Sequence, residues 1–287
     1  MAIWQRSIIL GFLLIGGRLE LRATTLQPVS KLRLRSSVAL VQDQRTGEFL
    51  VEKQAGAVMP IASITKLMTA MVVLDAGLDL HEPIVITPED VDMLRHSRSR
   101  LPVHTQLTRG EAMMLALMAS ENRAAHALGR TYPGGLQVFV AAMNTKAAAL
   151  GLSESRFEDP AGLSGGNVAS ARDLAKLVNA AHHYPQIRDF STRDEATIYS
   201  GRRSLAFINT NALVRGHRWN IGLSKTGYIE EAGKCLVMQA RLGERPLLIV
   251  LLDSWGKYTR LGDAQRIKQW LEGPVPAPVH KRKPRRG

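Results

Sequence analysis

The chain has 287 residues, of which 45% are hydrophobic and 22% are charged. This composition is that of an ordinary globular protein, and it excludes a wholly disordered, collagen-like or coiled-coil chain. The single cysteine, Cys235, excludes an intramolecular disulfide and a zinc site built from cysteines. Lysine plus arginine outnumber aspartate plus glutamate by 38 to 25, and the net charge of +13 indicates a polyanionic neighbourhood such as nucleic acid, anionic lipid or an acidic polymer.

The N-terminus has the pattern of a secretory signal peptide. Arg6 precedes an apolar run from Ile8 to Gly17, and this run is too short to span a bilayer, which needs about 20 residues. A short positive start followed by a short apolar core is typical of exported proteins, and a buried N-terminal helix is the alternative. Charged residues stand where a cleavage site favours small ones. We expect residues 1–23 to be removed, with Ala23 as the last of them.

The C-terminal residues 273–287 combine four prolines with five lysines and arginines. Prolines favour an extended polyproline conformation and stop regular structure. The segment also lacks the apolar face that an amphipathic membrane anchor requires. We therefore expect a disordered, solvated basic tail and no stable membrane anchor.

Two β-rich runs open the folded part of the chain, and helices follow them. Ser37–Gln42 and Glu48–Glu52 flank a turn that contains Gly47, and this arrangement predicts a hairpin. Ser63–Ala76 is apolar on nearly every side, which predicts a buried helix that begins with a serine. Further helices are expected over Arg109–Met118, Glu121–Arg130, Gly134–Leu150 and Ser170–His182.

Strands return in the last third of the chain, over Trp219–Ser224, Gly233–Arg241 and Pro246–Leu252. A closing helix is expected over Asp263–Leu271. Strands from both ends of the chain must then meet in one sheet, with the helices inserted between them. This order predicts an α+β fold rather than a regular βαβ alternation. We expect one domain over residues 36–272.

Three short motifs carry candidate chemistry. Ser63-Ile64-Thr65-Lys66 starts the first predicted helix, Ser120-Glu121-Asn122 lies at a break between two helices, and Lys225-Thr226-Gly227 ends a strand. Each motif is weak alone, because a chain of this size holds about one S-x-x-K by chance. Together, in this order, they match the S-x-x-K, S-x-N and K-T-G set of penicillin-binding proteins and related β-lactamases.

The first motif can supply a nucleophile and its base. Residues three apart share one helix face, so Ser63 Oγ and Lys66 Nζ can meet. A serine hydroxyl needs a base, and Lys66 can be that base only as a neutral amine. Apolar neighbours and the cation of Lys225 are expected to lower the pKa of Lys66. The structural alternatives are a helix N-cap for Ser63 and a surface lysine for Lys66.

The second and third motifs can complete the site. Ser120 can relay a proton between Lys66 and a leaving amine, and Asn122 can hold a substrate amide or the lysine ammonium. The alternative for this motif is an N-cap for the helix that follows. Lys225 and Thr226 can bind the terminal carboxylate of a peptide that lies along the strand edge.

The third motif also bears on how a developing negative charge is stabilised. Gly227 permits close backbone approach because it has no Cβ. An oxyanion hole needs two backbone N–H donors. We expect Ser63 and Tyr228 to provide them.

The residues around these motifs resemble the low-molecular-mass penicillin-binding D-alanyl-D-alanine peptidases. Met59–Ala70 looks like the active-site segment of that family, and residues 37–271 follow its pattern. His104 departs from the pattern, because a glycine is expected there. Four segments resemble the soluble D-alanyl-D-alanine endopeptidase branch: Ser97–Leu101, Ser120–Ala125, Tyr132–Gly135 and Gly233–Met238.

The resemblance implies a β-lactamase/transpeptidase-like fold, in which a twisted antiparallel sheet is flanked by helices and a helical lobe. It implies a serine D,D-peptidase that acts on peptidoglycan stem peptides through an acyl-enzyme on Ser63, with Lys66 as general base and with no metal or cofactor. β-Lactam antibiotics are then expected as covalent inhibitors. The carboxypeptidase branch usually carries a second β-rich domain and an amphipathic helix, whereas this chain ends soon after Leu271. We expect a monomeric periplasmic endopeptidase that cleaves D-alanyl–diaminopimelate cross-links.

Three alternatives remain open at this point. A D-alanyl-D-alanine carboxypeptidase uses the same motifs. A β-lactamase needs a deacylating base, for which Glu154 and Glu158 are available but lie outside the expected sequence frame. A non-catalytic polyanion-binding protein could use a basic patch of Arg95, Arg98, Arg100, Arg109 and the C-terminal tail. No nucleic-acid-binding motif is present, however, so we expect no nucleic-acid partner.

Overall fold

The two ends of the chain meet in one antiparallel sheet. The computed structural model describes residues 32–273, and its five-stranded sheet has the order β2-β1-β11-β10-β9. Strand β1 pairs with β11, so Val38 lies opposite Leu252. The predicted hairpin and the predicted union of N- and C-terminal strands are therefore confirmed. The strands are β1 (Val38–Asp43), β2 (Phe49–Lys53), β9 (Asn220–Ile229), β10 (Gly233–Leu242) and β11 (Arg245–Ser254).

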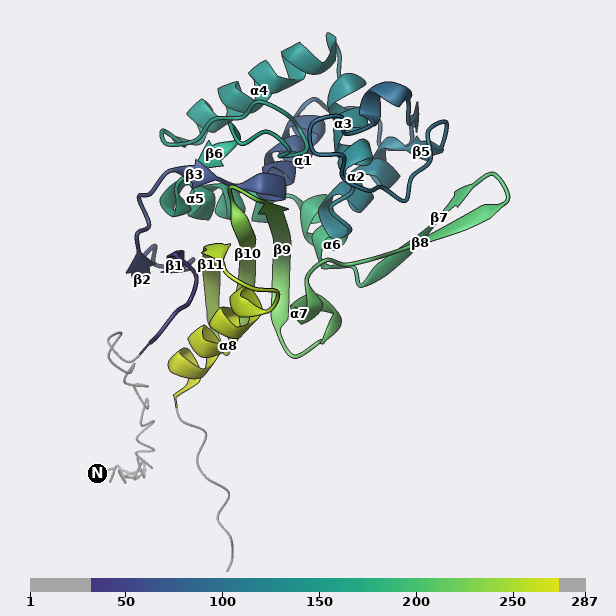
Figure 1. Cartoon of the computed structure of the whole chain (residues 1–287). Helices are drawn as coiled ribbons and strands as arrows, with labels where there is room; N and C mark the ends of the chain where they lie inside the picture. The colour runs from purple at the N-terminus through teal and green to yellow at the C-terminus, as the bar shows by residue number, and fades with distance from the viewer. Residues whose placement is uncertain (1–31, 274–287) are drawn as a thin grey trace, which may run out of the picture.

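The helices cover both faces of this sheet and form a lobe above one end of it (Figure 1). Side chains along a strand alternate between the two faces. Accordingly Val250 joins the core beneath α5, whereas Ile249 joins the second core beneath α8. The helices are α1 (Lys66–Asp75), α2 (Arg109–Met118), α3 (Asn122–Arg130), α4 (Gly135–Ala149), α5 (Ala171–His182), α6 (Pro185–Thr192), α7 (Ala212–Arg215) and α8 (Thr259–Glu272).

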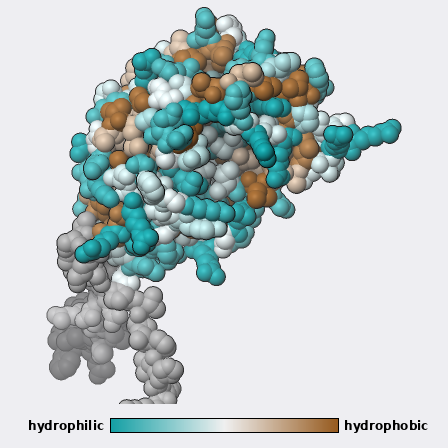
Figure 2. Space-filling view, in the orientation of Figure 1, coloured by the Kyte–Doolittle hydropathy of each residue, from teal (hydrophilic) through white to brown (hydrophobic). Residues whose placement is uncertain are grey.

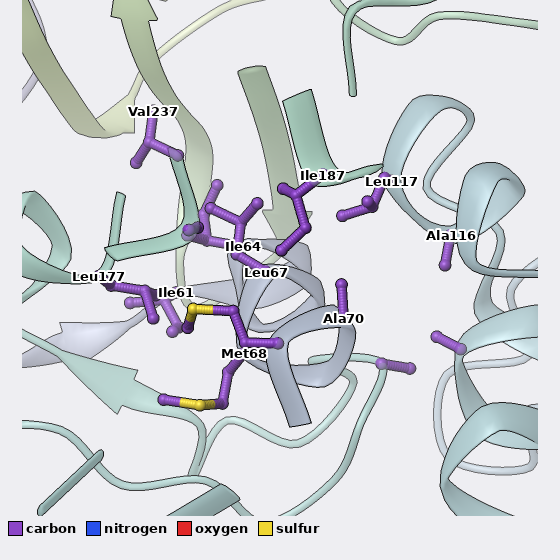
Figure 3. Packing of buried hydrophobic residues seen from close by; sticks show 14 of the residues in the cluster. Ile61, Ile64, Leu67, Met68, Ala70, Ala116, Leu117, Leu177, Ile187 and Val237 are labelled. Carbon is purple, nitrogen blue, oxygen red and sulfur yellow. The ribbon is translucent and has the colours of Figure 1, made fainter. Parts of the chain in front are cut away.

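Helix α1 lies at the centre of the larger core. Its side chains Leu67 and Met68 are fully buried, and Figure 3 shows them among residues of the sheet and of several other helices. The neighbours include Leu117 of α2, Leu177 of α5 and Val237 of β10. Because α1 is packed on all sides, its first turn is held rigidly between the sheet and the helical lobe.

Short elements complete the fold. The hairpin of β7 and β8 projects from the body of the molecule (Figure 1). Figure 2 shows a mixed surface on this side, with small hydrophobic patches among hydrophilic residues and a hydrophilic hairpin tip. These elements are β3 (Met59–Pro60), η2 (Ala62–Thr65), β4 (Pro83–Val85), η3 (Pro88–Asp90), β5 (Gln106–Thr108), β6 (Val168–Ala169), β7 (Glu195–Ser200) and β8 (Arg203–Ile208).

The structure corrects three details of the sequence prediction. The helix expected to begin at Ser63 starts as the 3-10 turn η2, and α1 begins at Lys66, so Ser63 caps no α-helix. Strand β9 continues past the third motif to Ile229 instead of ending there. The N-cap of α3 is Glu121, whose side chain accepts from the Arg123 N–H, and therefore Ser120 is not the cap.

The backbone conformation at His104 explains why the family pattern has a glycine at this position. Its backbone φ is +70°, in the left-handed region that favours glycine. The glycine expected from the family pattern would adopt this conformation without strain.

Several predictions lie partly or wholly outside the described residues. The predicted signal peptide over residues 1–23 lies wholly outside them. The predicted tail over residues 273–287 lies outside them except for Gly273. Within residues 32–273, none of the helices has the length and the apolar character that a membrane crossing requires.

Candidate active site

The 3-10 turn η2 presents Ser63 between the sheet and the lobe. Gly227 of β9 packs directly on this turn, since a Cβ atom added to it would lie 2.9 Å from Ile61 O and 3.2 Å from Ser63 N. Ala62 has a φ of +49°, a left-handed conformation that redirects the chain just before Ser63. The backbone N–H of Ser63 therefore lies next to the strand that carries the third motif.

Lys66 points back to Ser63 from one turn further along. Its Nζ lies 2.8 Å from Ser63 Oγ, 2.7 Å from Asn122 Oδ1 and 2.6 Å from Ala161 O. The side chain is fully buried. Burial lowers the pKa of Lys66 from 10.5 to about 7, although the charges of Asp159, Glu121 and Asp92 oppose the shift. Near neutral pH the amine can thus both hold and release a proton.

The second motif lies in direct contact with Lys66, through Asn122. Ser120 has a φ of +60° in the short break between α2 and α3. Its Oγ accepts a hydrogen bond of 2.8 Å from Lys225 Nζ. Asn122 uses both ends of its amide, since Oδ1 accepts from Lys66 and Nδ2 donates to Ser97 Oγ at 2.9 Å. The motif thus connects the lysines of the other two motifs.

The third motif lies in β9, which is an edge strand of the central sheet. Lys225 is buried, and burial together with the charges of Lys66 and Arg260 lowers its pKa well below 10.5. Thr226 Oγ1 donates to Thr210 Oγ1 at 2.6 Å. Tyr228, the next residue but one, is 60% exposed. The unpaired edge of β9 is available to an extended peptide.

A loop that sequence reasoning missed supplies the third acceptor of Lys66. Asp159 Oδ1 accepts from the N–H groups of Ala161 and Gly162 at 2.7 and 2.6 Å. Its Oδ2 accepts from Ser164 N at 2.8 Å. Gly162 has a φ of +77°, and a Cβ atom there would lie 2.0 Å from Ala62 O. The Asp159 carboxylate therefore fixes the loop so that Ala161 O faces Lys66. The sequence signal was an acidic residue that opens a segment rich in proline and glycine.

Two arginines near the site have roles that the sequence did not reveal: Arg95, which was considered only for a polyanion-binding patch, and Arg260, which was not considered. Arg95 donates to Leu163 O at 2.5 Å and to Glu231 Oε1 at 2.9 Å, so it joins three loops beside the site. Arg260, near the start of α8, lies close enough to lower the pKa of Lys225. Among the described residues its buried Nε has no hydrogen-bond partner. A buried donor of this kind is suited to an incoming carboxylate.

Of the two carboxylates considered for a β-lactamase, the structure gives hydrogen-bond partners for Glu158. Glu158 accepts from Arg156 at 2.6 Å and from Ser164 Oγ at 2.6 Å. Lys66 and Ser63 find their hydrogen-bond partners in Asn122, Ala161 and each other instead. In the part of the chain that the structure describes, no three His, Cys, Asp or Glu side chains gather as a metal site.

Comparison with known proteins identifies the family. Residues 24–256 match the family model described as D-alanyl-D-alanine carboxypeptidase, so the chain belongs to this family of serine D,D-peptidases. A D-alanyl-D-alanine endopeptidase of Pseudomonas aeruginosa is 48% identical over 241 residues, which cover 83% of this chain and 78% of the relative. A D-alanyl-D-alanine endopeptidase of Escherichia coli is 43% identical over 254 residues, with 86% and 82% covered.

A solved structure confirms the predicted fold class. The Streptomyces K15 DD-transpeptidase is similar with a TM-score of 0.77 and 27% identity, over 83% of this chain and 97% of that chain. The predicted family resemblance and the β-lactamase/transpeptidase-like α+β fold are both confirmed.

Proposed function

We propose that this serine D,D-peptidase is a D-alanyl-D-alanine endopeptidase that cleaves peptidoglycan cross-links through an acyl-enzyme on Ser63. The observation that carries the chemistry is the buried Lys66 Nζ, 2.8 Å from Ser63 Oγ, with a pKa lowered to about 7. The preference for cross-links is supported by the two relatives named endopeptidase at 48% and 43% identity.

Acylation begins when neutral Lys66 takes the hydroxyl proton of Ser63. Ser63 Oγ then attacks the carbonyl carbon of the D-alanyl residue, and the C=O π electrons move to oxygen. The backbone N–H groups of Ser63 and Tyr228 stabilise that oxyanion. As the C–N bond breaks, the leaving amine receives a proton that Lys66 passes through Ser120. Asn122 holds Lys66 in place during this exchange. Water then hydrolyses the acyl-ester by the same route in reverse order.

The substrate lies along the edge of β9 as an added strand. Lys225 and Thr226 bind the carboxylate that follows the scissile bond. Arg260 Nε, which has no hydrogen-bond partner within residues 32–273, supports them. Gly227 lets the peptide backbone approach η2, because any side chain at this position would contact Ile61 and Ser63.

The proposed setting is the periplasm. An N-terminal signal peptide over residues 1–23 directs export, residues 36–272 form the peptidase domain, and residues 273–287 form a basic tail. The net charge of +13 is compatible with binding to an acidic wall polymer. We propose a monomer with no stable membrane anchor, and we expect β-lactam antibiotics to acylate Ser63.

Purified cross-linked and uncross-linked muropeptides test this proposal. After incubation with the protein, mass spectrometry is expected to show dimers converted to monomers, and Ser63→Ala is expected to leave the dimers intact. Conversion of pentapeptides to tetrapeptides, with dimers unchanged, would instead identify a carboxypeptidase.

A further inference from the structure

A hollow of about 320 Å³ lies at the ends of β9, β10 and β11, and the reaction above uses none of its side chains. We call it the strand-end pocket, and its walls include Tyr228, Glu230, Lys234, Asp253 and Trp255. Tyr228 directly follows Gly227, which packs on the backbone of Ser63. The pocket therefore begins where the proposed oxyanion hole ends.

The walls combine aromatic rings with charges of both signs. Trp255 is 85% exposed and Tyr228 is 60% exposed, so both rings of this pocket offer apolar area to a ligand. Lys234 Nζ lies 4.0 Å from the centroid of the Tyr228 ring. Glu230 and Asp253 stand on the same pocket. The apolar area of the rings and the Lys234 cation suit a peptide that carries a free carboxylate, whereas Glu230 and Asp253 can accept hydrogen bonds from its amide N–H groups.

The backbone under the pocket is shaped by an irregularity in the sheet. Lys234 pairs with Ser254 and Leu236 with Leu251, so β11 contains one extra residue at this point. Asp253 has a φ of +47°, and a Cβ atom added to Gly233 would lie 2.5 Å from Asp253 Oδ1. Bulges and left-handed residues of this kind cost free energy and concentrate at functional sites.

The position of the pocket relative to the scissile bond indicates its occupant. The segment after Trp255 leads directly into α8 and to Arg260, beside Lys225. In the proposed function these cations bind the carboxylate that follows the scissile bond. A leaving D-alanine ends at that carboxylate and does not extend to the pocket. A leaving diaminopimelate continues past it into a second stem peptide.

We propose that the strand-end pocket binds the second stem peptide of a cross-link and so favours cross-links over free D-alanyl ends. This inference rests on the proposed endopeptidase function and adds the part of the substrate that the catalytic motifs do not contact. Trp255 and Tyr228 pack against the stem, and Lys234 pairs with one of its carboxylates.

Trp255→Ala and Lys234→Gln test the proposal. The rate constants to compare are kcat/KM for a sugar-free cross-linked peptide dimer, kcat/KM for an uncross-linked pentapeptide, and the rate of acylation by penicillin. Each variant is expected to lose about 10-fold or more on the dimer, with less than about twofold change in the other two rates. Tyr199→Ala, an exposed ring on the projecting hairpin, and Lys257→Gln, a lysine stacked on Tyr258, are the matched controls and are expected to match the wild type.

Each alternative outcome has a distinct meaning. Equal losses on dimer and pentapeptide, or no loss on the dimer, would overturn the pocket proposal while leaving the endopeptidase function intact. A loss that appears only with sugar-bearing dimers would assign the pocket to the glycan strand and overturn the peptide assignment. Wild-type protein that trims pentapeptides but leaves dimers intact would overturn the proposed function itself, and the pocket proposal with it.

Discussion

The rate of acylation by a β-lactam is expected to follow the protonation state of Lys66. With an ordinary pKa of 10.5, about one lysine in 3,000 would be neutral at pH 7. The lowered pKa of about 7 makes about half of the molecules neutral at that pH. The gain in the reactive form is about three orders of magnitude, equivalent to about 5 kcal/mol of differential interaction between the two protonation states.

The second-order rate constant of acylation should therefore rise about tenfold per pH unit below pH 7 and level off above about pH 8. Time courses with a fluorescent penicillin, quenched and separated by gel electrophoresis, measure it directly. A rate that is flat between about pH 5 and 9, or that rises until about pH 10, would refute the role assigned to burial.

The same shift has a consequence for stability that serves as an independent check. Because the folded pKa of Lys66 lies below the unfolded value, the unfolded chain binds more protons between about pH 7 and 10.5. The free energy of unfolding contributed by Lys66 therefore rises with pH across that window. Lys66→Met removes this contribution, so the difference in unfolding free energy between wild type and variant is expected to grow in favour of the wild type as pH rises. A difference that is independent of pH would contradict the shift.

Further substitutions probe other parts of the site. Gly162→Ala is expected to lower the free energy of unfolding by more than about 2 kcal/mol, because the added Cβ would collide with Ala62 O and residue 162 has a left-handed backbone conformation. Gly165→Ala on the same loop is the control, because a Cβ atom there meets no atom within 4 Å. Equal denaturant midpoints for the two variants would count against the role assigned to the loop. Lys225→Ala is expected to reduce kcat/KM about 10- to 100-fold for peptides that end in a carboxylate but much less for their amides; equal losses on both would remove its assigned role. Glu158→Gln should leave the lifetime of the penicillin acyl-enzyme within about twofold of the wild type, and a much longer lifetime would identify Glu158 as a deacylating base.

The local features of the site could be predicted from sequence because they depend on short-range geometry. Ser63 and Lys66 are three residues apart, and one helical turn brings them within 2.8 Å whether the turn is 3-10 or α. The apolar residues next to Lys66 in the sequence indicated the burial that lowers the pKa of Lys66. The strands and the main helices followed from periodicity and cap residues, as at Ser170, whose side chain accepts from Asp173 N.

The missed features depend on contacts between distant segments. Ala161 O reaches Lys66 across 95 positions, and nothing local marks a backbone carbonyl as a ligand of an amine. Nothing in the sequence distinguishes Arg260 from the other arginines, because only the packing of α8 places it beside Lys225. The projecting hairpin of β7 and β8 was not predicted either, because its exposed strands lack the sustained apolar alternation by which a half-buried strand is recognised.

The most direct test is to locate the adduct that penicillin forms with the intact protein. Mass spectrometry of the digested, labelled wild type should place the adduct on Ser63. The variants Ser63→Ala and Lys66→Ala should remain folded but unlabelled. Labelling of Ser63→Ala at the wild-type rate, or an adduct on Ser97 or Ser120, would contradict the account of a serine activated by a neutral lysine.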